Sequence, residues 1–115
     1  MGRIINAEKV AQIKAARLSN PELLGPALGE LVIESNVPVV AVAELLHVAE
    51  PTIYRWMYGE SEPRDADKVL KLKRLLALLR KARKGKEFPL LGTTEARVEL
   101  VVQLIEKYKP APRPA

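Results

Sequence analysis

The sequence predicts an all-α domain of five to six helices, and three of its features support that prediction. Apolar residues recur at three- and four-residue spacings in several segments, which is the period of an amphipathic helix. Asn, Ser, Thr, Gly and Pro separate these segments, and these residues begin or end helices. The chain has 115 residues, the length of one domain, so residues 1–115 are expected to share a single core.

The first third of the chain is expected to hold two helices separated by a turn. The first is predicted over residues 7–17, with Asn6 as its N-cap. The Ser-Asn-Pro sequence at 19–21 ends it and favours a new start, with Asn20 as cap and Pro21 at the first helical position. Gly25-Pro26 then interrupts the chain, so residues 21–24 are expected to form a separate turn. The second helix is predicted over residues 27–35. The side chains expected to point inward from these two helices are Val10, Ile13, Leu28, Leu31 and Val32.

Two short segments follow, over residues 39–46 and 51–58. The first is apolar and rich in valine, so by itself it fits a buried strand as well as a helix. Its pairing with the second segment, described below, favours a helix. The second segment ends at Gly59, a residue suited to a helix C-terminus.

The longest predicted helix spans residues 66–84, with Asp65 as its cap and Gly85 at its end. Its apolar stripe is wider than a single helix–helix interface can bury. Part of the stripe must therefore pack against the last helix or against a second chain. The default is packing within the chain, and a homodimer through this leucine-rich helix or through the C-terminal helix is the alternative. The stripe consists of Val69, Leu70, Leu72, Leu75, Leu76, Leu78 and Leu79.

A C-terminal helical extension is expected over residues 86–108, and a disordered tail over 109–115 because that tail is rich in proline. Thr93 or Thr94 caps the last helix, which ends near Tyr108. Its expected inward side chains are Val98, Val101, Val102 and Ile105.

The composition excludes several classes of site. The chain has no cysteine and a single histidine, His47, so a disulfide framework and a metal site are not expected. No apolar run has the length of a membrane span, and no membrane partner is expected. Neither a nucleophile–base pair nor a phosphate-binding glycine loop is present, so the chain is not expected to be an enzyme or to hold a cofactor.

Positive charge is concentrated in one segment of the chain. The net charge is +5, yet residues 64–86 alone carry ten bases and two acids, a net charge of +8. A concentrated basic patch is typical of a protein that binds a polyanion. A solvated helix face is the alternative reading of the same pattern.

Residues 39–58 read VVAVAELLHVAEPTIYRWMY. Two helices that cross steeply through a tight turn need a small residue at the crossing and interlocking apolar residues around it. Ala43 is the small residue, and the apolar positions are Val42, Leu46, Val48, Ile53 and Trp56.

This stretch resembles the helix-turn-helix of the lambda-repressor/Cro family. Gly59 and Pro63, which follow the second helix, extend the resemblance to about residues 27–80. The sequence departs from that family at the turn, where His47 replaces the usual glycine. Glu44 and Glu50 also place negative charge near the expected DNA face.

The resemblance implies a cytoplasmic, nucleoid-associated protein that binds double-stranded DNA by sequence, as a bacterial or phage transcriptional regulator. The second helix would then enter the major groove, with Trp56 inside and Tyr54, Arg55 and Tyr58 outside. Packing of Tyr54 and Tyr58 on a neighbouring helix is the alternative. The expected base-reading residues are Glu50, Pro51, Tyr54, Arg55 and Tyr58. The expected phosphate-binding residues are Thr52, Arg64, Lys68, Lys71, Lys73, Arg74 and Arg80.

Two other functions fit the same sequence. One is a protein–protein adaptor, in which the helix pair does not bind DNA and Glu44, Glu50, Glu60 and Glu62 face a basic partner. The other is an architectural protein that binds DNA without sequence choice, through phosphate contacts alone.

Overall fold

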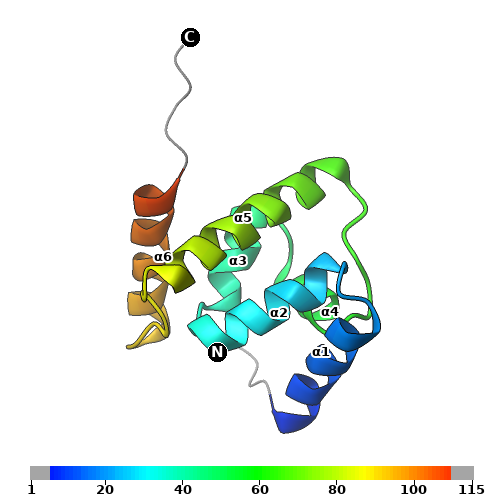
Figure 1. Ribbon diagram of the computed structural model, residues 1–115. Helices are drawn as coiled ribbons and strands as arrows, with labels where there is room; N and C mark the ends of the chain where they lie inside the picture. Colours follow the sequence, from blue (N-terminus) through cyan, green and yellow to red (C-terminus); the bar gives the residue numbers. More distant parts are fainter. Residues whose placement is uncertain (1–5, 110–115) are drawn as a thin grey trace.

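The computed structural model of the chain describes residues 6–109, and every regular element in that range is a helix (Figure 1). The expected all-α fold is therefore confirmed. The elements are α1 (Ala7–Ser19), α2 (Leu24–Ser35), α3 (Val39–Leu46), α4 (Glu50–Met57), α5 (Ala66–Lys84) and α6 (Thr94–Tyr108).

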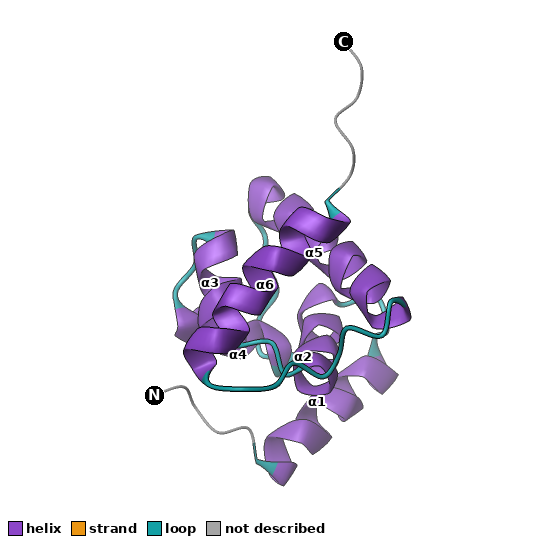
Figure 2. Ribbon diagram, turned by 90° about the vertical axis from the view of Figure 1, so that its left-hand side faces the viewer, coloured by secondary structure: helices purple, strands orange, loops and turns teal. Residues whose placement is uncertain are grey.

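Helix α2 is the centre of the fold. It packs against α1, α4 and α5, whereas α4 and α5 have few or no contacts with each other. Figure 2 shows α6 in front of the other helices, with α3 at the left and α5 towards the upper right. Helix α6 packs against α5 and α3. The largest fully buried side chains come from five helices: Ile13, Leu28, Leu46, Ile53, Met57, Leu72, Leu76 and Leu79.

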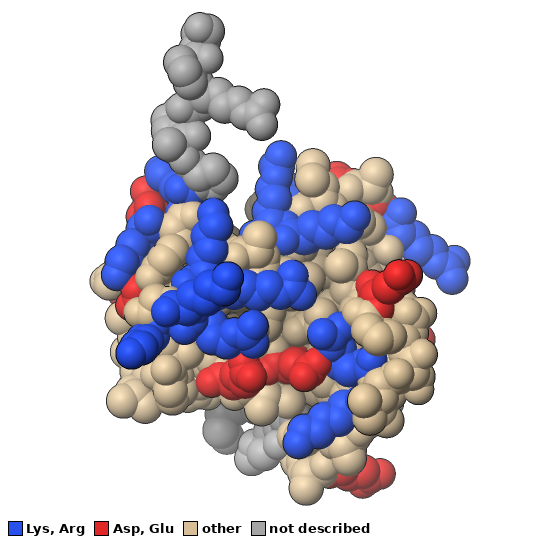
Figure 3. Space-filling model, viewed as in Figure 1, with Lys and Arg blue, Asp and Glu red and all other residues tan. Residues whose placement is uncertain are grey.

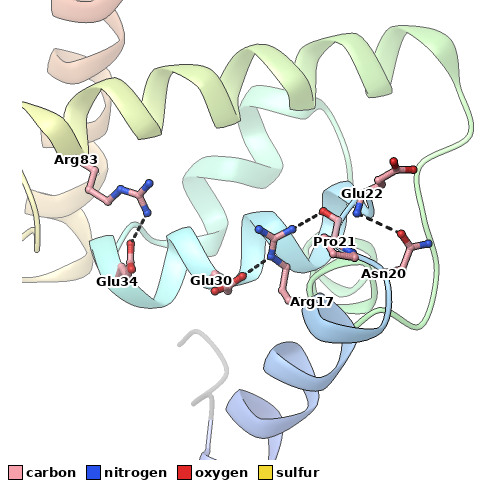
Figure 4. Close-up of polar contacts among 7 residues, drawn as sticks. All are labelled: Arg17, Asn20, Pro21, Glu22, Glu30, Glu34 and Arg83. Carbon is pink, nitrogen blue, oxygen red and sulfur yellow. Dashed lines mark hydrogen bonds and ion pairs between the residues drawn. The ribbon is translucent and has the colours of Figure 1, made fainter.

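The start of α2 differs from the prediction. Gly25-Pro26 was expected to interrupt the chain, but both residues lie in the first turn of α2, which begins at Leu24. Proline is tolerated there because the first N–H groups of a helix have no partner within the helix. Asn20 caps no helix at Pro21; its Oδ1 accepts a hydrogen bond from the Glu22 N–H at 3.2 Å within a turn (Figure 4).

The remaining helix boundaries follow the sequence closely. Residues 39–46 and 66–84 are helical as predicted, and the helix expected over 51–58 spans 50–57 instead. Asn6 and Asp65 cap α1 and α5 through their side chains. Thr93 caps α6, where its Oγ1 accepts the Ala96 N–H at 3.1 Å. Residues 110–115, most of the expected tail, lie outside the described range.

One apolar side chain expected to point inward is exposed, and one residue of the wide α5 stripe is not covered within the chain. Val102 of α6 is 51% exposed, and Leu104 is buried in its place. The inward stripe of α6 runs through Val101, Leu104, Ile105 and Tyr108, and Val102 lies outside that stripe because successive residues are about 100° apart. Leu70 of α5 is 47% exposed. None of the described helices is long and apolar enough to cross a membrane.

Candidate nucleic-acid interface

The α3–α4 pair turns at His47, the position where the resembling family usually has glycine. His47 adopts a left-handed conformation, with φ 54° and ψ 49°. The Val48 N–H donates to the Ala43 carbonyl at 3.0 Å and closes the turn. Histidine tolerates this conformation better than most residues, so the departure from glycine does not disrupt the turn.

The residues predicted to lock the two helices together lie in the core. Val42, Ala43, Leu46, Ile53 and Trp56 are buried, and Val48 is half-buried. Behind them, α2 crosses α4 so closely that a Cβ atom on Gly25 would lie 2.1 Å from the Trp56 carbonyl oxygen. The position of α4 is therefore set by direct backbone contact with the central helix as well as by interlocking side chains.

Fewer side chains of α4 are exposed to solvent than the sequence predicted. Pro51 and Arg55 are exposed, and Glu50 and Thr52 are half-buried. Tyr54 and Tyr58 were expected to be exposed beside Arg55, and that expectation is wrong.

The two tyrosines are only 4% and 7% exposed, respectively, with ring centroids 5.9 Å apart. Helix α1 lies beside Tyr58: the Lys9 ammonium is 4.7 Å from the ring centroid, and Gln12 Nε2 donates to the Tyr58 carbonyl at 3.2 Å. The resemblance did not include α1, so it gave no sign that α1 would lie there. Tyr54 and Tyr58 belong to the hydrophobic core and not to an open reading surface.

The electrostatic character of the α4 side is mixed. Arg55 is the only base on α4, and Lys9 lines the same hollow of about 470 Å³. Glu60 lines that hollow too, with Oε1 4.0 Å from Lys9 Nζ. Glu44 is exposed and shares a shallow hollow with His47 and Glu50 at the turn. This side therefore lacks the excess of positive charge that the sequence carries elsewhere.

The predicted phosphate-binding residues divide into two groups. Lys68 Nζ donates to the Leu46 carbonyl at 2.7 Å and to the His47 carbonyl at 3.3 Å, so it holds the C-terminus of α3. Lys71 pairs with Asp67 at 3.2 Å. Within residues 6–109, the others form no ion pair: Arg64, Lys73, Arg74 and Arg80.

Helix α5, which carries most of these bases, and helix α4 both pack against α2 but have few or no contacts with each other. The space-filling view shows Lys and Arg side chains gathered over α5 (Figure 3). Two acids of α2 pair with bases of neighbouring helices, one on α5 and one on α1. Arg83 pairs with Glu34 at 3.1 Å, and Arg17 forms a close contact with Glu30 (Figure 4).

Two of the four acids assigned to a basic partner in the adaptor hypothesis have partners within the chain. Glu62 accepts the N–H groups of Gly25 at 2.9 Å and Leu24 at 3.2 Å, so it caps the N-terminus of α2. Glu60 accepts a long hydrogen bond of 3.5 Å from Gln12. The capping role of Glu62 could not be found in the sequence because 37 residues separate it from Gly25.

The structure thus leaves Pro51 and Arg55 exposed beside one hollow, with Glu50 and Thr52 half-buried on the same helix. Lys73, Arg74 and Arg80 lie on α5, which has few or no contacts with α4. Within the described residues, no three His, Asp or Glu side chains are grouped so that they could hold a metal ion. Comparisons of the chain with protein-family models, curated proteins and solved structures found no match.

Proposed function

We propose that the protein binds double-stranded DNA through the α3–α4 pair, with the N-terminal part of α4 in the major groove. The observation that carries the proposal is the local geometry. A three-residue turn through left-handed His47 joins two interlocked helices, and the second helix exposes Pro51 and Arg55. A single α-helix fits the major groove of B-form DNA, where every base pair presents a distinct pattern. A bacterial or phage transcriptional regulator, as the resemblance implies, is the biological role we propose.

Arg55 is the residue we propose to select a base. Its exposed guanidinium can donate two hydrogen bonds to a guanine edge, the commonest specific contact in the major groove. Glu50, in the first turn of α4, can accept from a cytosine amino group. Lys9, which lines the same hollow as Arg55, and Thr52 of α4 are proposed to contact phosphate. Tyr54 and Tyr58 are proposed to hold α4 in position rather than to touch a base.

A second candidate function is DNA binding without sequence choice, through the outer face of α5. The observation in its favour is the set of exposed bases Lys73, Arg80 and Lys84, which form no ion pair within the described residues. They lie on α5, which packs against α2 and has few or no contacts with α4. Phosphate contacts of this kind supply affinity and salt dependence but no discrimination among sequences.

A selection from random duplex DNA separates the two functions. It is run with the wild-type protein, with Arg55→Ala and with the double substitution Arg80→Gln and Lys84→Gln. We expect the wild type to enrich a motif, Arg55→Ala to lose about 1–3 kcal/mol of preference at one base of it, and the α5 variant to keep the motif.

The salt dependence of DNA binding is an independent test that distinguishes the two candidate functions. Each phosphate contact contributes about 0.9 to the slope of log K against log salt, so loss of two contacts reduces that slope by about 1.8. If the α5 variant shows this loss and the wild type enriches no motif, the second function replaces the first. Absence of binding at low salt would refute both and favour the adaptor role.

A further inference from the structure

An apolar groove lies where α3, α5 and α6 meet, outside the α4 site. Its volume is about 340 Å³. Leu75, Leu78 and Ile105 line it, and Leu45, which is 37% exposed, contributes from α3. An open groove lined by aliphatic side chains stabilises a ligand by removing its apolar surface from water.

The groove has a basic rim. Lys71, Arg74 and Lys81 of α5 and Lys109 after α6 also line it, and no acid does. Arg74 and Lys81 form no ion pair within residues 6–109.

The other two rim bases have acids close in sequence. Lys71 pairs with Asp67 at 3.2 Å, and Lys109 pairs with Glu106 at 2.8 Å. All four of these side chains are at least 36% exposed, and exposed pairs of this kind are weak enough for a ligand carboxylate to compete with them.

We propose that this groove binds an acidic amphipathic helix of a partner protein. Its apolar face would enter the groove, and carboxylates along its flank would meet Arg74 and Lys81. From Lys71 to Lys81 the rim extends about 15 Å along α5, because a helix rises about 1.5 Å per residue. That length matches about three turns of a bound helix, which presents apolar residues at positions i, i+3, i+4 and i+7.

The charge distribution disfavours the other occupants. A second copy related by a two-fold axis through the groove would place the basic rim against itself. Residues 1–5 and 110–115 each contain one arginine and no acid, so neither terminal segment complements the rim. Duplex DNA would satisfy the bases but would leave the apolar groove against charged phosphates, which disfavours it.

The proposal is tested with a synthetic peptide, since the partner is defined by chemistry alone. The probe is a fluorescein-labelled helical peptide with leucines at the four positions above and glutamates on both flanks. Its binding to the full chain is followed by fluorescence anisotropy. Two control peptides are used. The first has the same composition in scrambled order. The second keeps the leucines but has lysines in place of the glutamates. We expect the acidic amphipathic peptide alone to bind.

Adjacent residues of α5 provide the matched variants. Arg74→Glu and Lys73→Glu change the net charge equally, but only Arg74 lines the groove. We expect Arg74→Glu to weaken binding by about tenfold or more and Lys73→Glu by less than about twofold. Ala77→Glu places a carboxylate in the groove at an exposed helical position, so it tests the groove without removing a core side chain. It should weaken binding as strongly as Arg74→Glu, with an unchanged circular dichroism spectrum.

Four results would overturn the proposal. Equal effects of Arg74→Glu and Lys73→Glu, or equal binding of the scrambled peptide, would mean that only diffuse charge attracts the probe. Sedimentation that shows a dimer disrupted by Ala77→Glu would assign the groove to a second copy. Duplex DNA binding that depends on Arg74 and not on Lys73 would assign it to nucleic acid.

Discussion

Replacement of Gly25 by alanine tests the close approach of α2 to α4, on which the position of α4 depends. A Cβ atom at residue 25 would lie 2.1 Å from the carbonyl oxygen and 2.5 Å from the carbonyl carbon of Trp56. Both atoms belong to the backbone of a packed helix, so they cannot rotate away. The Cβ atom and the carbonyl oxygen must separate by about 1.4 Å or more to restore an ordinary contact, because non-bonded atoms attract most at about 3.5–4 Å.

The expected loss of stability follows from two opposing terms. Overpacking of this kind costs about 3 kcal/mol, the upper end of the usual range, because backbone atoms oppose it. Alanine recovers about 1 kcal/mol through its higher helix propensity. We therefore expect Gly25→Ala to lower the free energy of unfolding by about 2 kcal/mol, or the melting temperature by about 8 °C. Urea unfolding followed by circular dichroism measures the first quantity directly.

Gly85→Ala is the matched control. A Cβ atom there would lie 2.2 Å from the Tyr108 hydroxyl, almost the same overlap, but that hydroxyl is the far end of a side chain. Tyr108 can move by rotation about its side-chain bonds, so we expect a change of less than about 1 kcal/mol. Equal stabilities of Gly25→Ala and the wild type would refute the close backbone contact between α2 and α4.

Three further substitutions test contacts that place the helices. Glu62→Gln removes the charged cap at the start of α2, so we expect about 1 kcal/mol less stability in urea unfolding, and an unchanged value would contradict the cap. Lys68→Met removes the ammonium that binds two carbonyls at the end of α3, and a loss of about 1 kcal/mol is expected, whereas Lys73→Met should have none. The pKa of Glu87 lies below its usual value of 4.5 because Lys107 and Tyr108 donate hydrogen bonds to it. Its contribution to stability is present above about pH 4.5 and is lost as the pH falls through the lowered pKa, so Glu87→Gln should flatten the acid side of the stability profile, measured by urea unfolding between about pH 6 and pH 3.

Local sequence determined the helices and the α3–α4 pair. Caps at Asn6, Asp65 and Thr93, together with the apolar period of each segment, located five of the six helices to within two residues at each end. Such signals are local because a cap acts on N–H groups two or three residues away. The start of α2 was missed because proline is compatible with a first turn, and nothing in the adjacent sequence shows that Gly25 packs against Trp56.

The composition of the candidate site depended on contacts between distant residues. The period of α4 identified Ile53 and Trp56 as core, but burial of Tyr54 and Tyr58 depends on their long-range packing, and the sequence offers no local signal for that packing. The position of the charged residues in space likewise cannot be read from the local sequence. The basic character of residues 64–86 can be read from the sequence, whereas the lack of close contact between α5 and the helix that carries Arg55 depends on how the helices pack around α2.

The sequence by itself therefore determined the all-α class, most helix boundaries and the core of the helix pair, because capping and periodicity act over a few residues. Only the tertiary structure decided which face of α4 is open, which acids serve as internal caps, and which bases surround an apolar groove. These properties arise from side chains as far apart in sequence as Gln12 and Tyr58, or Glu62 and Gly25. Their proximity is a result of packing around α2 and has no local signature in the chain.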